Sequence, residues 1–235
     1  TTKCRWNTTA SAGGKTMPEP SRRRSELPAA ELTGWSAADW GKIEQIWRDL
    51  VGPPNADPAD HLPKFAGVEI AGDEAGYVFQ KWILEAFRVS GASVEGPFLV
   101  PMTSQRNAVG GRALAEQLPR GRTTEEIDGL VLCDWQAFAV ECKFEKVDFD
   151  PIARLHLVAE RRPVGTLGLL FTPFGFTEPA LELVAELRPI RVLLFHYSDI
   201  DFAVHTRDFL DTVYRKWRAA VKYGLPYLPV HDPRD

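Results

Sequence analysis

The sequence has few cysteines and no long apolar stretch. Its 235 residues include only three cysteines, Cys4, Cys133 and Cys142, which are widely spaced and form no Cys-x-x-Cys pair. This scarcity argues against a disulfide-stabilised scaffold and against a zinc site built from cysteine, and it favours a reducing cytoplasm. No apolar run reaches the roughly 18 residues that a membrane-spanning helix needs, so the sequence predicts no such helix.

Positive charge is also scarce overall. The 28 Lys and Arg residues are outnumbered by 32 Asp and Glu residues, and the net charge of −4 excludes a polybasic nucleic-acid coat protein. Binding to nucleic acid stays open, because it depends on where the cations lie rather than on their sum. Residues 103–123 carry four arginines against one glutamate. We expect phosphate contacts from this segment and the helix near residue 154, through Arg106, Arg112, Arg120, Arg122 and Arg154.

What is present is an ordinary globular composition, with 44% hydrophobic and 26% charged residues. Residues 1–34 are rich in Thr, Ser, Gly, Pro and Arg and lack apolar periodicity, which predicts a disordered tail. Residues 35–63 contain one amphipathic helix over 36–50 and a Pro/Asp-rich connector, which together predict an accessory element and linker. Residues 64–235 are expected to form the main domain.

The main domain reads as alternating helices and strands. A helix is predicted over 74–90, where apolar residues recur with a period of about 3.6. The elements expected after it are strands over 96–102, 127–133 and 137–144, a helix over 150–162 that begins at Asp150, a strand over 166–174, a helix over 177–188, a strand over 191–197 and a helix over 208–223. This αβββαβαβα order predicts an α/β protein with a mixed central sheet flanked by helices.

Two charged side chains stand out on the expected strand 137–144. Because side chains alternate between the two faces of a strand, Glu141 and Lys143 share one face, and Cys142 takes the opposite, apolar face. Charges on a central strand destabilise the fold unless they are paired or bind a metal ion. Because Cys142 points to the opposite, apolar face, it is interpreted as a core residue rather than a nucleophile.

The turn between the second and third expected strands decides which residue lies opposite Glu141. If the turn is centred between Asp134 and Trp135, Asp128 faces Glu141, and their Cβ atoms are about 5 Å apart. A three-residue loop would shift the register by one and separate them. Two opposed carboxylates destabilise a sheet, and a divalent cation would remove that penalty. Two carboxylates, waters and a phosphate are ligands that Mg²⁺ accepts.

The pattern Asp128…Glu141-Cys142-Lys143 resembles the signature of the PD-(D/E)xK, or restriction-endonuclease-like, nucleases, with residues 74–204 most similar to their Mrr-type and Holliday-junction-resolvase-like branch. The resemblance implies Mg²⁺ or Mn²⁺ held by Asp128, Glu141 and the backbone carbonyl of Cys142, with Lys143 acting on the phosphodiester. One position departs from the pattern, since many relatives carry Glu on the first core helix where this sequence has Gln80.

The resemblance implies a metal-dependent endonuclease that hydrolyses DNA phosphodiester bonds in restriction or defence. RNA is not excluded as a substrate, because it offers the same phosphodiester. The expected partners are DNA, a second copy of the chain in a homodimer, and a protein such as an NTPase. The alternative is a non-catalytic nucleic-acid-binding or regulatory subunit that retains the fold, which Gln80 and the acidic net charge favour.

Three further polar residues follow the last expected strand. His196, Asp199 and Asp201 are interpreted as loop residues, although strand ends often carry functional side chains.

Overall fold

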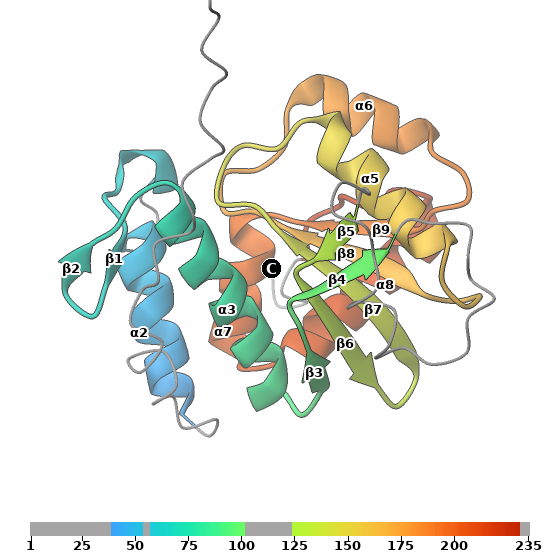
Figure 1. Cartoon of the computed structure of the whole chain (residues 1–235). Coiled ribbons are helices and arrows are strands. Elements are labelled where there is room, and N and C mark those ends of the chain that lie inside the picture. The colour runs from blue at the N-terminus through green and yellow to red at the C-terminus, as the bar shows by residue number, and fades with distance from the viewer. Residues whose placement is uncertain (1–38, 54–56, 102–123, 231–235) are drawn as a thin grey trace, which may run out of the picture.

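The computed structural model describes residues 39–53, 57–101 and 124–230, and it confirms an α/β fold with a mixed sheet between helices (Figure 1). The elements in chain order are α2 (Trp40–Val51), the short 3₁₀ helix η1 (Pro58–Asp60), β1 (Lys64–Phe65), β2 (Val68–Glu69), α3 (Asp73–Val89), β3 (Ser93–Glu95), β4 (Phe98–Pro101), β5 (Thr124–Ile127), β6 (Gly129–Cys133), β7 (Gln136–Cys142), α5 (Phe149–Glu160), β8 (Leu167–Phe171), α6 (Glu178–Glu186), β9 (Val192–Phe195), α7 (Tyr197–Thr206) and α8 (Phe209–Tyr223).

The main sheet has five strands in the order β3-β6-β7-β8-β9, with β7 at its centre. β3, β6 and β7 pair antiparallel, whereas β7, β8 and β9 pair parallel through the crossover helices α5 and α6. In the β6–β7 hairpin Leu132 pairs with Ala137 and Gly129 with Val140. This is the register expected from a turn centred between Asp134 and Trp135, so that prediction is confirmed.

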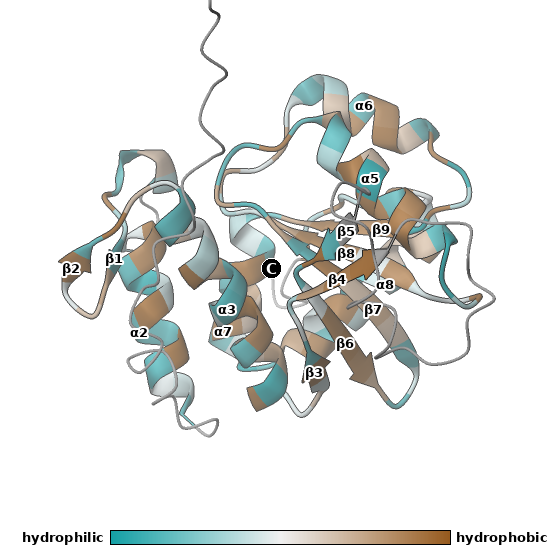
Figure 2. Ribbon diagram, viewed as in Figure 1, coloured by the Kyte–Doolittle hydropathy of each residue, from teal (hydrophilic) through white to brown (hydrophobic). Residues whose placement is uncertain are grey.

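The sheet separates two hydrophobic cores. One lies under α2, α3, α7 and α8, and the other lies under α5 and α6 (Figure 1). The alternation along β7 serves both cores, because Phe138 and Val140 enter the first and Ala139 enters the second. Hydrophobic residues accordingly run along the strands of the sheet (Figure 2). Burial on both faces makes β7 a rigid element from which a site can be built.

α2 packs directly into the first core. Trp47 and Leu50 are fully buried, and the Trp47 ring stacks on Trp82 of α3 with 5.0 Å between centroids. The Trp82 indole N–H donates to the carbonyl of Ile43 at 2.8 Å. α2, α3 and the sheet therefore share one core.

The strand expected over 96–102 is wrong in its extent. The chain forms β3 in the main sheet and then β4, which pairs with β5 in a separate two-stranded sheet. The break falls at Gly96-Pro97, where proline has no N–H for the ladder and Gly96 adopts a φ of +124°. A Cβ at Gly96 would lie 2.8 Å from the Cα of Gly129, so only glycine fits this approach.

Two helix starts also differ from expectation. α5 begins at Phe149, with Asp148 rather than Asp150 at its N-cap. Residues 197–206 form α7, so the interpretation of Asp199 and Asp201 as loop residues is wrong. His196 caps α7: its side chain accepts from the Ser198 N–H, and the Asp199 carboxylate accepts from the His196 N–H.

Candidate functional site

The site forms where the β5–β6 junction meets the end of β7. Asp128 lies in the bend between β5 and β6, one residue before the paired part of β6. Its carboxylate oxygen Oδ2 accepts a hydrogen bond from the backbone N–H of Cys142 at 2.7 Å. The side chain is therefore fixed against the last residue of β7, next to Glu141.

Glu141 and Lys143 lie on one face of the chain, as expected from strand alternation. The Lys143 ammonium is 2.6 Å from the Glu141 carboxylate, and the two side chains are 32% and 21% exposed. Beyond the end of β7, the Lys143 N–H donates to the carbonyl of Phe171 at 2.9 Å, which holds the residue against β8. The structure thus brings Asp128, Glu141 and Lys143 together at the C-terminal end of the central strand β7.

The ionised form of the Asp128 carboxyl group is disfavoured by its surroundings. Burial, and then the charge of Glu141, raise its pKa from 3.8 to about 7, although the Cys142 N–H and the Lys143 ammonium lower it. Two close carboxylates in a low-dielectric setting cannot both ionise easily. A cation at this position would relieve the penalty.

Lys143 is held in its charged form. Burial lowers its pKa, but the charge of Glu141 and the hydrogen bond to it outweigh burial, and the pKa is raised above 10.5. At neutral pH the side chain is therefore an ammonium donor and not a base.

Gln80 belongs to the site. It is 6% exposed on α3, and its side-chain Nε2 donates to the backbone carbonyl of Asp128 at 3.1 Å. The amide therefore fixes the bend that carries Asp128, and it adds no charge to the site.

Cys142 is only 7% exposed and joins the first core, on the opposite face from Glu141. Burial raises the pKa of its thiol well above the usual range. The thiol stays protonated, which fits its interpretation as a core residue.

Sequence reasoning missed two contributors. The charge of Glu126, on β5, also raises the pKa of Asp128. Gly129 brings β6 against α3, because a Cβ there would overlap the side chain of Leu84. Glu126 stands two residues before Asp128, and this spacing is the one signal that the sequence offered.

The phosphate contacts expected from basic residues stay a prediction. Arg106, Arg112, Arg120 and Arg122 lie outside the described residues. Arg154 is exposed on α5, and within the described segments it forms no ion pair.

The donor set suits one small divalent cation. Among the described residues no group of three or more His, Cys, Asp or Glu side chains is arranged to hold a metal ion. Asp128 and Glu141 are two carboxylates, and Mg²⁺ is commonly held by one or two carboxylates with waters and substrate phosphate as its other ligands. The raised pKa of Asp128 is the penalty that such an ion would remove.

Comparison with solved structures gives distant likenesses. No family model and no curated protein matches the sequence. The solved structure of AF1548, a protein of unknown function, is similar at a TM-score of 0.37 and 15% identity, over 63% of this chain and 78% of that chain. The MspJI restriction endonuclease in complex with a 27-mer oligonucleotide is similar at a TM-score of 0.32 and 17% identity, over 68% of this chain and 35% of that chain. At these TM-scores neither likeness bears on function.

The described helices include none with the length and apolar character to cross a membrane.

Proposed function

We propose that this protein is a Mg²⁺-dependent endonuclease that hydrolyses phosphodiester bonds in DNA, in restriction or defence. The observation that carries the proposal is the Asp128 carboxylate bound to the end of β7, beside the Glu141–Lys143 pair. Two carboxylates that can hold a metal ion, beside an ammonium that can stabilise phosphate charge, are groups that metal-assisted phosphodiester hydrolysis uses.

Asp128 and Glu141 would hold the cation, together with the backbone carbonyl of Cys142. When bound, Mg²⁺ or Mn²⁺ supplies Lewis acidity toward the phosphate and toward water. Gln80 keeps the Asp128 bend in place through its hydrogen bond to the backbone carbonyl. These residues therefore fix the position at which the scissile phosphate is held.

Lys143 would stabilise the charge that develops on the phosphate. Its ammonium contacts the Glu141 carboxylate, and with a cation held on Glu141 it would be available to the phosphate. Its N–H groups would then donate to a phosphate oxygen, where negative charge builds up in the transition state.

A homodimer would place two such sites against the two strands of a duplex. Sedimentation or light scattering, with and without duplex DNA, tests that arrangement directly. A monomer that cuts only one strand would limit the proposal to a nicking enzyme.

The second candidate is a nucleic-acid-binding subunit without catalysis. Gln80 favours it, because its amide is occupied by the Asp128 carbonyl and adds no carboxylate for a metal. Incubating supercoiled plasmid, single-stranded DNA and structured RNA with Mg²⁺, Mn²⁺ or EDTA separates the candidates. Metal-dependent cleavage of DNA supports the nuclease, cleavage of RNA alone changes the substrate, and binding without cleavage of any substrate favours the second candidate.

A further inference from the structure

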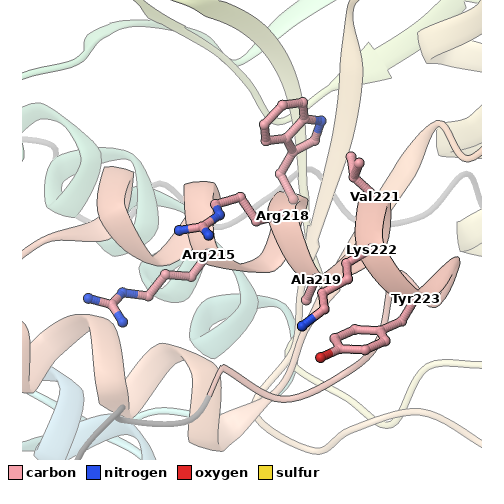
Figure 3. A pocket seen from close by; sticks show the side chains of 7 residues that line it. Arg215, Arg218, Ala219, Val221, Lys222 and Tyr223 are labelled. Carbon is pink, nitrogen blue, oxygen red and sulfur yellow. The ribbon is translucent and has the colours of Figure 1, made fainter.

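α8 presents a basic stripe to solvent. Arg215, Arg218 and Lys222 follow the i, i+3, i+7 spacing that places residues on one side of a helix, while Val213, Lys216 and Ala220 are buried on the other. The stripe borders a hollow of about 350 Å³ that is also lined by Trp217, Ala219, Val221 and Tyr223. No acidic residue lines this hollow, and Figure 3 shows the two guanidinium groups extending to the same side of the helix.

Aromatic rings hold these cations in place. Arg218 lies over the Tyr214 ring at 5.7 Å, and the Lys222 ammonium lies 4.8 Å from the centre of the Tyr223 ring. Within the described residues neither cation forms an ion pair with a carboxylate. Arg215 differs, because it pairs with Asp211 at 2.6 Å. Arg218 and Lys222 are thus two oriented charges that are free to bind an anion.

The rings themselves are unusually exposed. Tyr223 is 57% exposed, Tyr214 41% and Trp135 42%, and Val221 beside them is 68% exposed. Trp135, in the β6–β7 turn, lies 5.7 Å from Tyr214 and 5.9 Å from Trp217. The helix and the turn therefore form one surface in which flat rings alternate with cations.

We propose that this surface, made of Trp135 and the outer face of α8 from Tyr214 to Tyr223, binds single-stranded DNA. Cations that track phosphates and exposed rings that stack on unpaired bases are the two features that such binding uses. From Tyr214 to Tyr223 the helix carries no acidic residue, and a merely solvated helix face has no need to expose three aromatic rings. In a chain with a net charge of −4, this local excess of cations favours a polyanion.

The surface is separate from the carboxylate site. Trp135 precedes β7 and Glu141 lies near its end, and six residues of strand span about 20 Å. DNA bound at Trp135 would thus be about 20 Å from the carboxylate site. The choice of DNA as the polyanion rests on the proposed function, whereas the binding itself needs no cleavage.

Fluorescence anisotropy in EDTA tests the proposal on the full chain. The probe is a labelled oligothymidylate of about 20 nucleotides, titrated between about 50 and 200 mM salt. The test variant is R218Q/K222Q, and the matched control is K42Q/K64Q, which removes the same charge from exposed lysines on α2 and β1. Circular dichroism and thermal unfolding check that each variant is folded.

We expect R218Q/K222Q to weaken binding about tenfold and to reduce the salt slope by about 1.4, the value for two lost phosphate contacts on a single strand. The control should bind like the wild type. Y223A, which keeps the charges, should weaken binding about fivefold or more through lost stacking.

Three results would overturn the proposal: wild-type protein that does not bind the oligonucleotide, equal losses in the test and control variants, or tighter binding to a duplex of the same length. Loss of cleavage has no part in this measurement. A protein that binds through α8 but cuts no DNA with Mg²⁺ or Mn²⁺ would contradict the proposed function and would still support the proposed binding surface.

Discussion

Replacing Asp128 with Asn should stabilise the metal-free protein, and more strongly as the pH rises. The pKa of Asp128 is raised from 3.8 to about 7 by burial and by Glu141. Between these values the folded protein binds a proton that the unfolded chain has lost, so stability falls as the pH rises through this range. Asparagine removes the titration and keeps an oxygen that can accept from the Cys142 N–H, which now bonds Oδ2 at 2.7 Å.

The size of the effect follows from the pKa. A rise from 3.8 to about 7 corresponds to about 4 kcal/mol once the carboxyl is fully ionised in the fold. The unfolded chain, with a pKa of 3.8, is already mostly ionised at pH 5, so part of this loss of stability is present at pH 5. We expect the advantage of D128N over wild type to grow by about 2 to 3 kcal/mol between pH 5 and pH 8.

Urea unfolding in EDTA at these two pH values measures the difference. D134N is the matched control, because Asp134 is exposed in the β6–β7 turn, and its stability should follow that of wild type. Added Mg²⁺ should then stabilise wild type, because the ion binds the folded site and not the unfolded chain. It should not stabilise D128N, which lacks one of the two carboxylates. If D128N is no more stable than wild type at pH 8, or gains equally at both pH values, the electrostatic account of the site is wrong.

Three further sets of substitutions probe a buried ion pair elsewhere in the fold, and the packing and charge next to the site. Lys216 and Asp199 form a fully buried pair with 2.7 Å between Nζ and Oδ2, so K216M should destabilise the protein by about 3 to 5 kcal/mol, with partial recovery on adding D199N, as measured by urea unfolding. A Cβ at Gly129 would overlap Leu84, so G129A should lower stability by about 1 to 3 kcal/mol, and L84A/G129A should be less destabilised than the sum of the two single variants. Gln80→Glu should lower the melting temperature without metal and tighten Mg²⁺ binding in a calorimetric titration, because it adds a carboxylate beside the site. An unchanged melting temperature and Mg²⁺ affinity would show that the charge of residue 80 does not affect the site.

The central hairpin was predictable because its signals are local. A two-residue turn fixes the register, and the period-2 alternation of 137–144 assigns each side chain to a face, so the pairing of Leu132 with Ala137 was the one expected for a turn centred between Asp134 and Trp135. The same alternation placed Glu141 and Lys143 together. In that register Asp128 lies near them, one residue before the partner strand.

Other features depend on contacts that no local pattern encodes. α7 is capped by the His196–Asp199 box, and the buried Asp199 carboxylate also binds Lys216 of α8 and the N–H of Val230. The hydrogen bond from Gln80 to Asp128 joins residues 48 positions apart. Helical periodicity shows that Gln80 lies near the core but not which backbone carbonyl it meets.

Cleavage of supercoiled plasmid by wild type and Lys143→Ala, in Mg²⁺ and in EDTA, tests the central claim most directly. Lys143 is partly exposed, and its one ion-pair partner among the described residues is Glu141, so its loss should change stability by about 1 kcal/mol or less. A lysine that stabilises transition-state charge should contribute 10²-fold or more to the rate. The account predicts Mg²⁺-dependent cleavage by wild type and at least a hundredfold loss in a folded Lys143→Ala protein. Equal rates for the two proteins, or no cleavage by wild type with either Mg²⁺ or Mn²⁺, would contradict it.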